Sequence, residues 1–163
     1  MIQLSGITRI FHMGDQAIHA LDHIDLTIES GEYVSIMGPS GSGKSTLLNV
    51  IGLLDRPDSG HYLLDGRNVT DLSETEQAQV RREKIGFVFQ SFHLIPRLTA
   101  AENIELPLIL TGMPPADRKI RIMETLQAFN LSNRAHHRPA ELSGGQRQRV
   151  AIARATILRP TAL

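Results

Sequence analysis

The chain has 163 residues, enough to bury one core with a small appended subdomain. Its 17 basic and 17 acidic side chains balance, which excludes a strong net field that would hold nucleic acid or anionic lipid by itself. It has no cysteine, which excludes disulfides, thiolate zinc sites and cysteine nucleophiles.

The sequence predicts a soluble chain. Its N-terminal residues lack the basic start and the long apolar run of a signal peptide. No stretch approaches the ~18 apolar residues that are needed to cross a bilayer. Any membrane role is therefore expected to come through a partner.

The first third of the chain is predicted to be β-structure that leads into a helix. Ile24, Leu26 and Ile28 alternate with polar residues, the period of a half-buried strand. Residues 33–37 are predicted to form a short strand that runs into a glycine-rich loop. Residues 44–54 carry apolar side chains at helical spacing and are predicted to form a helix.

The next elements are a short strand, a polar helix and a second strand. Turn residues on both sides of residues 61–64 predict the short strand. Ser73 and Glu76 have the spacing of a capping box, which opens the polar helix. Residues 85–89 are predicted to form the second strand, with Gln90 at its end.

The segment after Gln90 is predicted to be mostly helical. Thr99 and Glu102 form another capping-box pattern, which opens a helix. A Thr-Gly-Met-Pro-Pro break follows, and residues 116–129 are predicted to form the next helix. Residues 91–158 are therefore interpreted as a helical subdomain inserted into an α/β core.

Residues 38–46 (GPSGSGKST) match the phosphate-loop pattern G-x-x-x-x-G-K-[ST] and lie between a predicted strand and a predicted helix. Glycines let backbone N–H groups turn toward phosphate oxygens, and the helix N-terminus adds partial positive charge. Lys44 is expected to bind the β- and γ-phosphates, Ser45 to ligate Mg²⁺, and Thr46 to reach an α- or β-phosphate oxygen. The alternative is a flexible Gly/Ser loop before a helix. The residues predicted to contact nucleotide here are Gly38, Ser40, Gly41, Ser42, Gly43, Lys44, Ser45 and Thr46.

A second glycine pair opens the helical pattern of residues 147–155. Ser143 and Gln146 have capping-box spacing, and the N–H groups of Gly144 and Gly145 would point out of the first turn, suited to an anion. Taken alone, this segment is equally explained as a plain helix cap.

Residues 142–155 resemble the signature motif, and the helix after it, of the ATP-binding subunits of ABC transporters, and the resemblance covers the whole chain. Residues 51–57 and 81–90 are most similar to the subgroup that serves lipoprotein release and macrolide export. The resemblance implies an α/β P-loop NTPase (RecA-like) core, with an N-terminal antiparallel β subdomain and an inserted α-helical subdomain. It places the nucleotide-binding core at residues 1–90, the helical subdomain at 91–158 and the start of the Walker B strand at 159–163.

The resemblance also implies roles for single residues. Gln90 corresponds to the glutamine that ligates Mg²⁺, senses the γ-phosphate and hinges the two subdomains, and it joins Lys44 as a catalytic group. Phe11 falls where the family has a tyrosine that stacks on adenine; alternatively, it is a core aromatic. The signature residues that would contact the γ-phosphate of ATP held by another subunit are Ser143, Gly144, Gly145 and Gln146.

The implied function is an energy-coupling ATPase. ATP and Mg²⁺ are the expected ligands, and a second copy, paired head to tail, is the expected partner. Transmembrane permease subunits are expected to contact residues 91–99, and no nucleic-acid partner is expected. The protein would then be cytoplasmic and peripheral on the inner face of the plasma membrane.

The family places an Asp-Glu pair at the end of the Walker B strand, and residues 161–163 resemble only the first residues of that strand. The C-terminal part of the core is therefore expected to be absent from this chain, with weak nucleotide binding, little or no hydrolysis, and reduced stability. Asp55 and Asp65 also end apolar runs, but both lead into turns and are interpreted as structural. The alternatives are a non-transport ATPase of the same class and a nucleotide-binding fragment without turnover.

Overall fold

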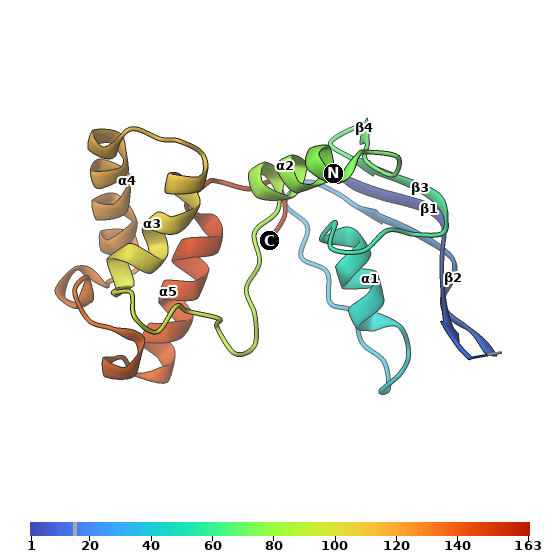
Figure 1. Ribbon diagram of the computed structural model, residues 1–163, viewed down its shortest axis with the longest axis horizontal. Coiled ribbons are helices and arrows are strands. Elements are labelled where there is room, and N and C mark those ends of the chain that lie inside the picture. Colours follow the sequence, from blue (N-terminus) through green and yellow to red (C-terminus); the bar gives the residue numbers. More distant parts are fainter. Residues whose placement is uncertain (15) are drawn as a thin grey trace. The chain divides into compact units, whose positions relative to one another are not determined.

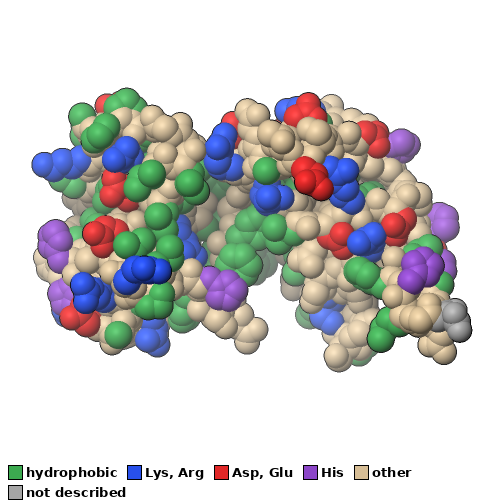
Figure 2. Space-filling view, in the orientation of Figure 1, with side chains coloured by type: hydrophobic (Ala, Val, Ile, Leu, Met, Phe, Trp, Pro, Cys, Tyr) green, Lys and Arg blue, Asp and Glu red, His purple; other side chains and the backbone are tan. Residues whose placement is uncertain are grey.

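The computed structural model describes residues 1–14 and 16–163, which fold as two compact units, Met1–Arg81 and Arg82–Leu163 (Figure 1). The division of the chain at residues 90 and 158 remains a prediction. None of the described helices is long and apolar enough to span a membrane. Acidic and basic side chains intermingle on the face shown in Figure 2.

The unit Met1–Arg81 is built on a four-stranded antiparallel sheet with the order β2-β1-β3-β4. Its strands are β1 (Ile2–Met13), β2 (Gln16–Ile28), β3 (Ser59–Leu64) and β4 (Arg67–Asn68). The apolar side chains that these strands bury are Ile2, Leu4, Ile7, Leu21, Tyr62 and Leu64. The antiparallel β-structure predicted for the N-terminal part is therefore confirmed.

Along the chain, one helix lies between β2 and β3, and a second helix follows β4. Helix α1 (Lys44–Ile51) ends before residue 54, the predicted end, because Leu53 adopts a left-handed backbone conformation (φ +53°) that a helix cannot continue. Helix α2 (Glu74–Lys84) begins after Ser73, whose hydroxyl accepts from the Glu76 N–H (3.3 Å) while the Glu76 carboxylate accepts from the Ser73 N–H (2.9 Å). The predicted capping box is confirmed.

The unit Arg82–Leu163 is mainly helical. It contains α3 (Ala100–Leu110), α4 (Pro115–Ala128), the short helices η1 (Ser132–Arg134) and η2 (Pro139–Glu141), and α5 (Gly144–Thr156). Thr99 and Glu102 form the predicted capping box at the start of α3. The core of the unit consists of Ala100, Ile104, Leu108, Leu126, Leu131, Leu142, Val150, Ala153 and Ile157.

Two predicted strands are wrong. Residues 33–37 pair with no other described segment, and within residues 85–89 only Ile85 pairs, through a single parallel bridge to Ala162. Within residues 159–163, Ala162 alone is in β-structure, through this same bridge. A parallel strand depends on partners that are distant in sequence, so an apolar run does not by itself make one.

A buried tyrosine makes the stability of the first unit depend on pH. Tyr62 is 1% exposed, and its hydroxyl donates to the Ile51 carbonyl (2.9 Å). Burial, and then the charge of Asp65, raise the pKa of Tyr62 above its ordinary value. Because the unfolded chain releases this proton near pH 10 and the folded chain holds it, we expect stability to fall as pH rises above about 10.

Spectroscopic titration of tyrosinate checks this expectation. The chain has two tyrosines, and the other, Tyr33, is 94% exposed. Tyr33→Phe leaves Tyr62 as the single phenol of the chain, and we expect this phenol to ionise only as the protein unfolds. Ionisation of Tyr62 in the still-folded Tyr33→Phe variant would contradict the burial argument.

Candidate functional site

The glycine-rich loop of residues 38–46 turns directly into α1. Gly43 is the N-cap of α1 in the left-handed region (φ +82°), and a Cβ there would collide with the carbonyl oxygen of Ala20. The first backbone bond of the helix runs from the Leu47 N–H to the Gly43 carbonyl (2.8 Å). The amides of residues 44–46 therefore precede the helical ladder and form a site suited to an anion.

Lys44 places an ammonium group within this loop. Its Nζ donates to the carbonyls of Gly38 (2.8 Å) and Pro39 (2.6 Å) and to the hydroxyl of Ser42 (3.3 Å). Ser45 follows it in the first turn of α1 and is exposed. The loop thus combines a cation, glycines and helix amides, a combination that can bind phosphate oxygens.

Phe11 lies in the same unit, on β1, and is 41% exposed, so it is not part of the buried core. The guanidinium carbon of Arg9 lies 4.9 Å from the centre of its ring. Arg9 is itself fixed by two hydrogen bonds to Asp55 (2.8 and 3.0 Å) and one to Asp58 (2.9 Å). These contacts give the aromatic ring a fixed cationic neighbour on β1.

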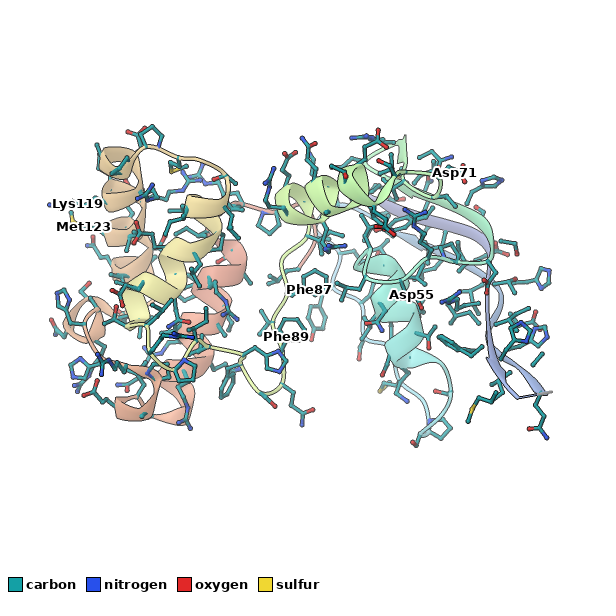
Figure 3. All side chains as sticks on the ribbon, viewed as in Figure 1. Asp55, Asp71, Phe87, Phe89, Lys119 and Met123 are labelled. Atoms are coloured by element: carbon teal, nitrogen blue, oxygen red, sulfur yellow. The ribbon has the colours of Figure 1, made fainter. Side chains whose placement is uncertain are left out.

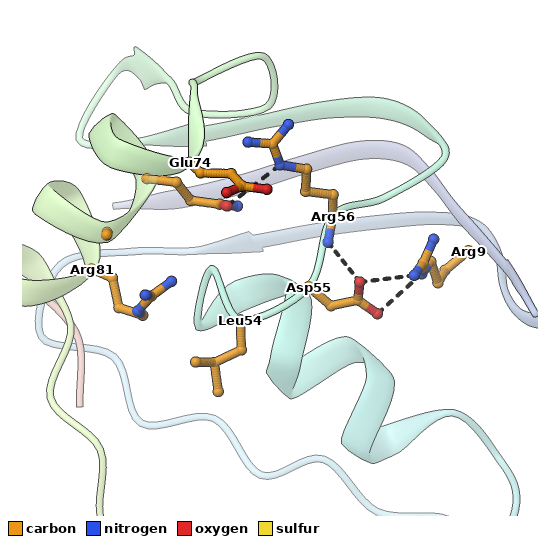
Figure 4. Close-up of a pocket in the computed structure, with 8 residues that line it drawn as sticks. Arg9, Leu54, Asp55, Arg56, Glu74 and Arg81 are labelled. Carbon is orange, nitrogen blue, oxygen red and sulfur yellow. Dashed lines mark hydrogen bonds and ion pairs between the residues drawn. The ribbon is translucent and has the colours of Figure 1, made fainter.

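A cavity of about 620 Å³ lies in this unit beside the same ion pair. Figure 4 draws the residues that line it. Both carboxylate oxygens of Asp55 accept from Arg9, and one of them also accepts from the Arg56 N–H (2.9 Å). Asp65 accepts from the N-terminal ammonium of Met1 (3.0 Å). Both contacts agree with the structural interpretation of these carboxylates. The cavity is lined by Arg9, Leu54, Asp55, Arg56, Glu74, Gln77, Ala78 and Arg81.

The second glycine pair opens α5, in the unit Arg82–Leu163. Ser143 is the N-cap: its hydroxyl accepts from the Gln146 N–H (3.3 Å), and its own N–H donates to the Gln146 side chain (2.9 Å). Gly144 and Gly145 are exposed, and a Cβ on either would meet no described atom within 4 Å. The packing described here therefore does not require these glycines.

Gln90 is also in this unit, exposed, in a turn closed by a bond from the Phe92 N–H to the Phe89 carbonyl (2.9 Å). Phe89 stacks on Phe87 at a ring-centroid distance of 5.8 Å and on His93 at 4.5 Å (Figure 3 labels Phe87 and Phe89). The sequence-predicted residues are thus divided: Phe11 and the phosphate loop lie in one unit, and Gln90 and the signature lie in the other.

Sequence analysis missed two polar residues that hold the segment after Gln90. Asn103 is fully buried in α3, and Arg154 is partly buried in α5; both bond to backbone groups of residues 92–99. A usable signal existed for Asn103, because it lies next to Ile104 in a helix that is apolar apart from Asn103, Glu102 and Glu105, and a buried amide needs partners.

Comparison with known proteins identifies the family. A family model described as "ABC transporter" matches residues 21–163. The uncharacterized ABC transporter ATP-binding protein YknY of Bacillus subtilis is 52% identical over 160 residues, which are 98% of this chain and 70% of that protein. The macrolide export ATP-binding/permease protein MacB of Marinobacter nauticus is 54% identical over 155 residues, which are 95% of this chain and 24% of that protein.

A solved structure agrees with these relatives. The dimeric post-hydrolysis state of the ATP-binding cassette MJ0796 of Methanocaldococcus jannaschii, bound to ADP and Pi, superposes with a TM-score of 0.86 at 51% identity. The match covers 98% of this chain and 71% of that one. The fold is accordingly the α/β P-loop NTPase fold of such cassettes.

Proposed function

The chain belongs to the ABC transporter family, and from this membership we propose that it is part of an ATP-binding subunit that couples ATP to export or to lipid or lipoprotein extraction. The observation that carries the proposal is the pairing, in one chain, of a complete phosphate loop at the start of α1 with a glycine pair at the start of α5. Alone, the first could be a flexible glycine loop and the second a plain helix cap. Neither alternative explains why both occur in one chain.

In this function the phosphate loop and β1 hold the nucleotide. The amides at the start of α1 and the ammonium of Lys44 would bind phosphate oxygens, and Phe11 would stack on adenine. The Arg9 contact supports the role of Phe11. The guanidinium lies over one face of the ring and fixes its orientation, so that the opposite face is presented to a ligand. Lys44 would also stabilise negative charge that develops during transfer of the γ-phosphoryl group.

We propose a magnesium ion, shared with the nucleotide, as a second ligand. The described residues contain no cluster of three His, Cys, Asp or Glu side chains, so they offer no all-protein cage. The exposed Ser45 hydroxyl and the Gln90 amide oxygen are hard ligands of the kind that Mg²⁺ takes together with substrate phosphates. When bound, Mg²⁺ would neutralise charge on the β- and γ-phosphates.

The start of α5 would bind the γ-phosphate held by a second copy. Glycine in a helix costs about 1 kcal/mol relative to alanine. No described atom approaches the Cβ positions of Gly144 and Gly145, so a need for close approach from outside the chain explains them better than internal packing. Ser143 and Gln146 would complete this contact in a head-to-tail dimer with two-fold symmetry.

Permease subunits are the proposed membrane partners, and they would place the protein at the cytoplasmic face of the plasma membrane. The turn after Gln90 supports this assignment, because it borders a cavity of about 390 Å³ in the unit Arg82–Leu163. Its lining is largely apolar and includes Phe87, Phe89 and Leu110, with Arg154 among its cations. An apolar segment of a partner would gain free energy by filling it.

ATP-dependent self-association tests the proposed function. Sedimentation of the chain is expected to show a dimer with ATP and a monomer without it. Gly145→Asp is expected to abolish the dimer while leaving ATP binding intact, because a carboxylate would face the partner's γ-phosphate. Ala140→Asp adds the same charge at an exposed position of η2 and is expected to dimerise normally. Equal dimerisation of both variants would refute the proposed contact.

A further inference from the structure

The turn that follows Gln90 has an unfavourable backbone. Phe92 (φ +60°) and His93 (φ +44°) both lie in the left-handed region, which bulky side chains rarely adopt. The turn is closed by bonds from the Phe92 N–H to the Phe89 carbonyl (2.9 Å) and from the His93 N–H to the Ser91 carbonyl (2.7 Å). Such a conformation persists only where the surroundings hold it.

Arg154 supplies that hold. Its two terminal nitrogens donate to the carbonyls of His93 (2.7 Å) and Phe92 (2.9 Å), the two residues with positive φ. Hydrogen bonds from a charged donor are stronger than neutral ones, and two bonds from one planar guanidinium also fix orientation. Burial lowers the pKa of Arg154, so the carbonyl contacts offset part of the desolvation of its charge.

The other end of the segment is fixed as well. The buried Asn103 side chain accepts from the Ile95 N–H (2.7 Å) and donates to the carbonyls of Ile95, Leu98 and Thr99. The segment between Gln90 and α3 is therefore bound to α5 at its start and to α3 at its end. The Phe89–His93 stack lies across the turn that carries Gln90.

We propose that Arg154 is a positioning residue for Gln90. It ties the turn that carries Gln90 to α5, the helix whose N-cap is Ser143. The distance between Gln90 and the start of α5, the two predicted nucleotide-contacting elements of this unit, is thereby fixed. This inference rests on the proposed function for the role of Gln90 in binding Mg-ATP. The attachment of the turn to α5 stands on the two hydrogen bonds of Arg154.

Hydrogen exchange tests the attachment without any activity. Arg154→Met is expected to raise amide exchange at Phe92 and His93 by roughly tenfold or more, because the closed turn loses its external hold. Arg154→Lys, which keeps one donor group, is expected to give a smaller rise. Arg149 is the matched control: it lies on the same helix and donates to the Phe129 carbonyl (3.2 Å), away from the turn. Equal exchange at the turn in Arg154→Met and Arg149→Met would overturn the proposal.

A double-mutant cycle tests the link to Gln90. Arg154→Met and Gln90→Ala are each expected to weaken Mg-ATP binding by roughly three- to tenfold, and their combination by no more than Gln90→Ala alone. Arg149→Met combined with Gln90→Ala is expected to be additive. Additivity of Arg154→Met with Gln90→Ala would overturn the positioning role. Unchanged affinity in Gln90→Ala would instead overturn the proposed role of Gln90, and the exchange comparison would still decide whether Arg154 holds the turn.

Discussion

Replacing Lys44 with alanine is expected to lower the affinity of the chain for ATP by about 100-fold or more. The ammonium lies among the loop carbonyls of Gly38 and Pro39, beside the amides that begin α1. When ATP is bound, it would donate hydrogen bonds to phosphate oxygens instead. A hydrogen bond to a charged group contributes about 1.5–3 kcal/mol, and two of them correspond to at least a hundredfold in affinity. Titration with a fluorescent ATP analogue measures this loss.

The control for this change is Lys119→Ala. Lys119 is exposed on α4, in the other unit, and Figure 3 labels it. Its removal deletes the same charge and is expected to leave ATP affinity within about twofold, because isolated surface charges contribute little. Binding of ATP by Lys44→Ala within threefold of the unchanged chain would show that the loop does not hold the phosphates.

Replacing Asn103 with alanine is expected to destabilise the helical unit by about 3 kcal/mol. The side chain is 0% exposed, and its single amide group serves four backbone partners. Its two N–H hydrogens are shared among three carbonyls, and its oxygen satisfies the Ile95 N–H. Alanine removes the partner of these part-buried backbone groups, and that cost exceeds the gain in helix propensity.

Chemical denaturation followed by circular dichroism measures this effect. Asn133→Ala is the matched control, because Asn133 is exposed in η1 and is expected to change stability by no more than about 0.5 kcal/mol. A similar midpoint for the two variants would mean that backbone groups after residue 94 find other partners.

Local sequence patterns predicted the helix starts well. The capping boxes at Ser73, Thr99 and Ser143 are all present, because each depends on two side chains three residues apart and on nothing else in the fold. The phosphate-loop pattern is equally local, since its glycines and Lys44 lie within nine residues, and its nucleotide contacts stay a prediction.

Contacts between distant residues were not predictable in this way. The strands expected at residues 33–37 and 85–89 failed because a parallel ladder needs partners that the local pattern does not specify. The roles of Arg9 and Arg154 were missed for the same reason: the first bonds to Asp55, 46 residues later, and the second bonds to carbonyls about 60 residues earlier.

The antiparallel sheet has a consequence for the order of synthesis. β1 pairs with β2, the next strand along the chain, but its other neighbour is β3 (Ser59–Leu64), so one edge of β1 stays unpaired until β3 has been synthesised. At about 5–20 residues per second, the ribosome takes roughly two to seven seconds to pass from the end of β2 at Ile28 to the end of β3 at Leu64. During that interval the growing chain presents an unpaired strand edge that another nascent chain can pair with. Slower translation of residues 29–58 is therefore expected to lower the yield of dispersed protein without changing a single contact of the finished fold.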